Sequence, residues 1–126
     1  MHYMVFVKMA GDLVGQPPQE LQQAMGDEMG RGFADGTLVH AGGLYATSYR
    51  GEFFVRAGEV TSFDGPYTET KEEVGGYAII DVRDHDEALA NARRMAELHQ
   101  KLWPGWAGSV EARRIAGPED IAPTQG

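Results

Sequence analysis

The stretch VGGYAIIDVRDHDEALANARRMAELHQKL, residues 74–102, decides the fold because one apolar strand leads directly into one helix. The run from Val74 to Asp81 has the length and composition of a strand. Asp84 and Glu87 have capping-box spacing, with Asp86 as a rival cap, and Pro104-Gly105 ends the helix. Apolar residues recur there every three or four positions: Ala88, Leu89, Ala92, Met95, Ala96, His99 and Leu102. This spacing predicts an amphipathic helix.

The same alternation of strand and helix extends over the rest of the chain. Residues 3–9 are apolar and read as a strand buried on both faces, and residues 20–33 have helical periodicity. Further strands are predicted at 37–45, 53–56, 59–63 and 109–115, the middle pair forming a hairpin around Ala57-Gly58. The order β-α-β-hairpin-β-α-β predicts the α+β class, as a ferredoxin-like two-layer sandwich. We expect one domain over residues 1–116, followed by a flexible tail at 117–126.

Two helices can cover only one face of such a sheet. Residues 3–9 and 37–45 are nevertheless apolar on both of their faces. The uncovered face therefore needs a second apolar surface, most simply that of another copy related by a two-fold axis. We expect a homodimer of the dimeric α/β-barrel type, with Val39, Ala41 or Tyr45 near the interface.

Composition excludes several classes of function. The 126 residues carry a formal net charge of −8, which argues against nucleic acid or an anionic membrane as partner. The chain has no cysteine, so disulfides and thiolate chemistry are excluded. The four histidines lack metal-ligand spacing, and no phosphate-binding loop is present, so we expect neither a metal nor a cofactor. With no signal peptide or membrane span in the sequence, we expect a cytoplasmic protein.

Several motifs resemble those of one family. Residues 64–72 read DGPYTETKE and are followed by GGY at 75–77, and residues 81–89 read DVRDHDEAL. Residues 99–106 read HQKLWPGW, and residues 110–113 read VEAR. In this register the chain resembles the YCII-related (DGPF) family over residues 1–116, with Tyr67 in place of the usual Phe and Val74 in place of Leu. The resemblance implies a dimerising ferredoxin-like α+β fold, and it links some relatives to chemistry on small ring-bearing molecules and others to sigma-type regulators.

The motif loop supplies the first candidate site residues. Asp64-Gly65-Pro66 is typical of a turn, and Glu69 and Lys71 follow within a few residues. Asp64 is a candidate catalytic carboxylate, and Glu69 and Lys71 are candidate ligand-binding groups at the rim of a pocket. The alternative is a turn cap followed by a solvated run of charges.

Two histidines and one tyrosine complete the candidate set. His40 is expected on one strand face with Leu38 and Gly42, and Gly42 and Gly43 leave room beside it for a ligand or another backbone. We expect a cavity there, with Asp64, Glu69 or Lys71 at its rim. Tyr45, near the end of the same strand, is a candidate ligand contact.

His99 lies on the apolar stripe of the second helix and matches the family's histidine. It is a candidate general base. For both His40 and His99, the alternative is a structural histidine bonded to the backbone.

Three functions fit these residues. The first is an enzyme that binds a small metabolite in a cleft and transfers protons, as an isomerase or lyase does. The second is a non-catalytic module that binds a ligand or a protein and is associated with sigma-factor-type regulation. The third is a purely structural dimer. Two titratable groups within hydrogen-bond reach beside an open volume would favour the enzyme.

Overall fold

The computed structural model of the chain describes residues 1–10, 13, 16–63, 65 and 72–121. Its elements are β1 (His2–Ala10), α1 (Gln19–Asp35), β2 (Leu38–Gly43), β3 (Glu52–Arg56), β4 (Glu59–Phe63), β5 (Glu72–Asp81), α2 (His85–Leu102), β6 (Gly108–Arg114) and α3 (Pro118–Ile121). This order confirms the predicted arrangement of strands, helices and hairpin. The short helix α3 lies within the segment predicted as a tail.

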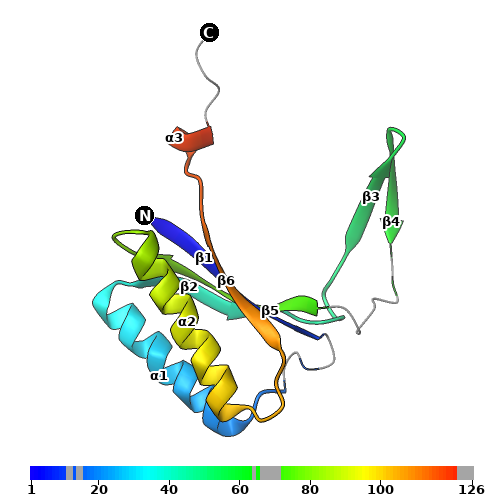
Figure 1. Ribbon diagram of the computed structural model, residues 1–126. Helices are drawn as coiled ribbons and strands as arrows, with labels where there is room; N and C mark the ends of the chain where they lie inside the picture. Colours follow the sequence, from blue (N-terminus) through cyan, green and yellow to red (C-terminus); the bar gives the residue numbers. More distant parts are fainter. Residues whose placement is uncertain (11–12, 14–15, 64, 66–71, 122–126) are drawn as a thin grey trace.

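Four of the strands form one antiparallel sheet in the order β2-β5-β1-β6. This is the strand order of a ferredoxin-like fold, once the inserted hairpin is set aside. Both long helices lie against the same face of the sheet (Figure 1). Strand β1 is central, between β5 and β6; Tyr3 and Val5 are buried on its helix side, whereas Met4 and Phe6 on the other side are partly exposed, so burial on both faces is not seen among the described residues.

The core lies between the sheet and the helices. Its buried residues come from β1, β2, β5 and α2 and the segment between the last two: Tyr3, Val5, Leu38, Ile80, Val82, Ala88 and Ala92. Helix α2 begins as predicted, because the Asp84 side chain accepts a hydrogen bond from the Glu87 backbone N–H at 2.9 Å. No helix within the described part of the chain is long and apolar enough to cross a membrane.

We call the surface of the sheet away from the helices the open sheet face. The alternation along β1 and β5 directs four partly exposed side chains to it: Met4, Phe6, Tyr77 and Ile79. At its β6 side, Glu111 accepts hydrogen bonds from Lys8 and Arg113. These bonds lower the pKa of the Glu111 carboxyl. The face thus has an apolar middle and a charged side.

The hairpin of β3 and β4 forms a separate two-stranded sheet. It stands away from the body of the molecule, and the helices lie on the other side of the main sheet (Figure 1). The two residues at its tip, Ala57 and Gly58, have φ angles of 52° and 79°, as a tight hairpin turn of the primed type requires. We call residues 52–63 the arm.

Candidate functional site

His40 lies on the open sheet face, which it shares with Gly42 as predicted but not with Leu38. Leu38 pairs with Ile80 in the core, but His40 pairs with Ile79 because the register shifts between these two β2 residues. Val39 is the extra residue of this bulge. A one-residue insertion transfers every later side chain to the opposite face, so strict alternation from Leu38 gives the wrong answer. Ala41, predicted near the dimer interface, consequently packs against the core.

The His40 ring makes a hydrogen bond with Tyr77 on the neighbouring strand. His40 Nε2 lies 2.7 Å from the Tyr77 hydroxyl oxygen, and the two ring centroids are 5.5 Å apart. His40 is exposed and Tyr77 is partly exposed. Two groups that can carry and release a proton therefore meet at the surface of the sheet, outside the core.

Gly42 makes room for this pair. It lies opposite Tyr77 in the sheet, and a Cβ atom at Gly42 would sit 3.2 Å from both Cε1 and the hydroxyl oxygen of Tyr77. The sequence predicted that the glycine leaves space for a ligand or a backbone, whereas the structure fills that space with the Tyr77 ring. Tyr77 was not predicted as a site residue, although its position in an alternating strand places it on the same face as His40.

A cleft of about 700 Å³ lies where β2 ends and the arm leaves the sheet. Tyr45, a predicted ligand contact, lines it together with Tyr49, and their rings meet edge to face at 5.1 Å. Arg50 donates hydrogen bonds to both carboxylate oxygens of Glu73, at 3.0 and 3.2 Å. Three of these residues, Tyr49, Arg50 and Glu73, were not predicted as site residues.

Tyr49 carries the backbone strain of this cleft. Its φ angle of 56° is in the left-handed region, which a bulky residue rarely adopts. The Tyr49 side chain is 91% exposed, and its ring meets that of Tyr45. The sequence gives no signal for this strain, because no glycine or asparagine occupies the position.

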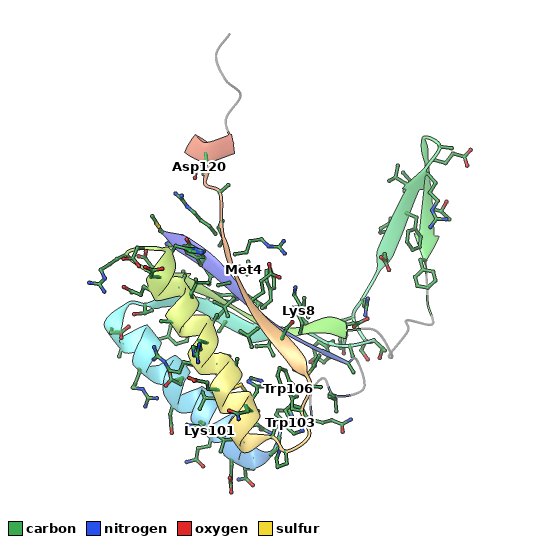
Figure 2. All side chains as sticks on the ribbon, in the orientation of Figure 1. Met4, Lys8, Lys101, Trp103, Trp106 and Asp120 are labelled. Carbon is green, nitrogen blue, oxygen red and sulfur yellow. The ribbon has the colours of Figure 1, made fainter. Side chains whose placement is uncertain are left out.

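His99 lies far from this arrangement in the fold. It faces the core from α2 with only 2% of its surface exposed, and its Nδ1 lies 2.9 Å from the Met95 carbonyl oxygen. The centre of its ring lies 4.7 Å from that of Trp106 and 6.5 Å from that of Trp103, the two tryptophans near the end of α2 (Figure 2). Burial lowers the pKa of His99, and the Met95 bond opposes that effect.

His99 and His40 therefore occupy opposite sides of the sheet and do not share a pocket. The bond to Met95 and the packing against two indole rings favour a structural role for His99. The residues that the structure describes hold no group of three or more His, Asp or Glu side chains suited to a metal ion.

Comparison with known proteins agrees with this fold. The family model of the YCII-related domain matches residues 1–116. The chain belongs to the YCII-related family. An uncharacterized protein of Rhizobium meliloti (strain 1021) is 40% identical over 60 residues. The match covers 48% of this YCII-related chain and 44% of that relative, less than half the length of either.

The YCII-related motif loop lies mainly outside the described residues. This applies to Asp64, Glu69 and Lys71, whose predicted roles remain predictions. Gly65, the described residue within the loop, has a φ angle of 102°, which a glycine adopts without the strain another residue would bear. The loop joins the arm to β5, so it follows directly from β4 and leads to Glu73 and Tyr77.

Proposed function

We propose that this YCII-related protein binds a small ring-bearing metabolite at the open sheet face, where His40 and Tyr77 transfer a proton. The hydrogen bond of 2.7 Å between His40 Nε2 and the Tyr77 hydroxyl carries the proposal. Neither ring belongs to the buried core, so core packing gives no reason for the pair. Gly42 keeps the space that the bond requires.

The pair supplies both halves of a proton transfer. A neutral imidazole accepts a proton near neutral pH, and a phenol hydroxyl donates one or relays it through its hydrogen bond. Removing a proton from a carbon next to a carbonyl and returning it to another atom of the same molecule leaves atoms and electrons balanced. Isomerisation, or elimination with protonation of the leaving group, therefore fits these two groups.

The cleft at the foot of the arm supports a ring-bearing ligand. Tyr45 and Tyr49 offer aromatic surface, and flat rings stack against such surfaces favourably. The ion pair of Arg50 and Glu73 adds charged groups at the rim of the cleft. Along β2, Gly43 in the cleft lining is three residue steps from His40, a span of about 10 Å.

We also propose that the protein acts as a homodimer. The open sheet face presents Met4, Phe6, Tyr77 and Ile79 with no helix over them in the described part of the chain (Figure 1). A second copy related by a two-fold axis would cover Met4, Phe6 and Ile79, and the proposed ligand would lie between the copies at His40 and Tyr77.

A thermal-shift screen with a library of ring-bearing carbonyl metabolites tests the proposed function. A specific ligand raises the melting temperature by mass action, and His40→Gln should abolish that rise. His2→Gln is the matched control, since His2 is another exposed histidine, at the end of β1. A ligand that stabilises the wild type and His40→Gln equally would refute His40 as part of the site.

A further inference from the structure

The arm has one covered face and one bare face. Its cross-strand pairs place Phe54, Arg56 and Phe63 on the same side. Phe54 and Phe63 meet edge to face at 5.6 Å, and the Arg56 guanidinium lies 5.2 Å from the centre of the Phe54 ring. These contacts partly cover that side of the hairpin.

The opposite side of the arm carries Phe53, Val55 and Val60. Their side chains are 69%, 70% and 68% exposed, and Val55 pairs directly with Val60. We call these three residues the bare arm face. A two-stranded hairpin is marginally stable in water by itself, and a contiguous apolar patch on a projecting element marks an interaction surface.

We infer that the bare arm face packs against a second copy of this chain, so that the arms of a two-fold dimer clasp the partner. The arm leaves the sheet at the end of β2 and stands away from the helices, as does the open sheet face (Figure 1). One two-fold arrangement can therefore cover both apolar surfaces of each copy. The inference rests on the homodimer proposed above and assigns the arm a part in it.

The area of the sheet favours this assignment. Four strands of about eight residues, at about 3.3 Å per residue and about 4.8 Å between strands, present a face of about 500 Å². A standard stable interface buries about 800 Å² on each partner. The arm enlarges the apolar surface that is available on this side of the chain.

Charge also favours a second copy as the occupant. The bare arm face carries no ionisable group, and on the open sheet face the Arg113 guanidinium, 5.8 Å from the centre of the Phe6 ring, is paired with Glu111. The chain as a whole carries −8, so copies repel each other at long range. Contact through uncharged apolar surfaces, strengthened by salt screening, is the form of association that such a chain permits.

The first experiment replaces all three residues of the bare arm face by threonine. Threonine keeps the β-branched shape of Val55 and Val60 and is itself favoured in strands at position 53, so the hairpin is preserved. Analytical ultracentrifugation should show the dimer dissociation constant rising by on the order of 1,000-fold, because each of the three buried apolar side chains contributes about tenfold. Leu89→Gln is the matched control: Leu89 is 46% exposed on α2, on the far side of the sheet, and its loss should leave the dimer unchanged.

The second experiment uses the absence of cysteine in the chain. A spin label is attached to the Val55→Cys variant, which is prepared without ¹⁵N and mixed with ¹⁵N-labelled wild type. Broadening of wild-type amide signals then reports contacts between copies. Amides of β1 and β5 should broaden, and those around Leu89 should not. Broadening around Leu89 instead, or none in a confirmed dimer, would overturn the inference.

The two proposals fail in distinguishable ways. If the wild type is monomeric at about 100 micromolar, the concentration range of the labelling experiment, the homodimer and the arm contact are both overturned. A dimer whose dissociation constant is unmoved by the triple threonine variant overturns the arm contact alone. In either case the ligand response of His40→Gln still decides the proposed binding function.

Discussion

Replacing Gly108 by alanine should destabilise the fold strongly. A Cβ atom there would overlap the Lys8 carbonyl oxygen and lie 2.5 Å from Cζ2 of Trp106. The indole packs against His99, and the carbonyl oxygen belongs to the β1 backbone that pairs with β6. Overpacking typically costs about 1–3 kcal/mol, and a clash with backbone lies at the upper end, about 3 kcal/mol.

Urea denaturation measures this cost. A loss of about 3 kcal/mol is a large share of the about 5–15 kcal/mol that stabilises an ordinary domain, and it lowers the melting temperature by on the order of 10 °C. Gly26→Ala is the matched control, because a Cβ atom at Gly26 meets nothing within 4 Å on the surface of α1. That variant should gain about 0.5–1 kcal/mol from helix propensity. If Gly108→Ala unfolds within about 0.5 kcal/mol of the wild type, a magnitude typical of neutral surface changes, the packing described at the end of α2 is wrong.

Three further predictions follow from single contacts. Gly42→Ala should break the His40–Tyr77 hydrogen bond and so change the ¹⁵N shifts of the His40 ring. Gly43→Ala should not, because its Cβ atom would meet only the Gly75 oxygen, at 3.7 Å. Equal changes of the His40 shifts in both variants would contradict the role of Gly42. Ala57→Asn should stabilise the arm, because Asn tolerates the left-handed φ of 52° better than Ala, and NMR hydrogen exchange of the β3 and β4 amides should slow. Burial lowers the pKa of His99 in the folded chain, so as the pH falls the unfolded chain binds a proton at His99 before the folded chain does. The contribution of His99 to stability is therefore complete above about pH 6.5 and falls as the pH drops below it. His99→Gln should reduce this fall in urea titrations from about pH 8 to pH 5.

The sequence predicts the fold well because the signals are local and agree with one another. The Asp84 cap, the stripe of α2 and the hairpin at Ala57-Gly58 each depend on a few neighbouring residues, and all are confirmed except for Leu89 of the stripe, which is exposed. The ferredoxin-like order follows from the sequence of elements and the requirement that two helices bury one sheet face.

The site was harder to predict because it depends on register and on partners distant in the sequence. One extra residue at Val39 moves His40 from the core face to the open sheet face, and nothing in the local composition marks that bulge. Tyr77 reaches His40 across 37 positions of sequence, and the strain at Tyr49 has no compositional signature. His99 shows the converse, because a histidine on an apolar stripe is compatible with both catalysis and core packing until its surroundings are known.

The ring nitrogens of His40 provide the most direct test of the central claim, that His40 and Tyr77 form one ligand-binding, proton-transferring pair. NMR with ¹⁵N-labelled histidine should show the His40 Nε2 signal shifting on Tyr77→Phe, and shifting again in the wild type when a ligand from the thermal screen is added. The His2 signals should stay in place in both experiments. A His40 signal that moves neither with Tyr77→Phe nor with a ligand that stabilises the protein would contradict the claim.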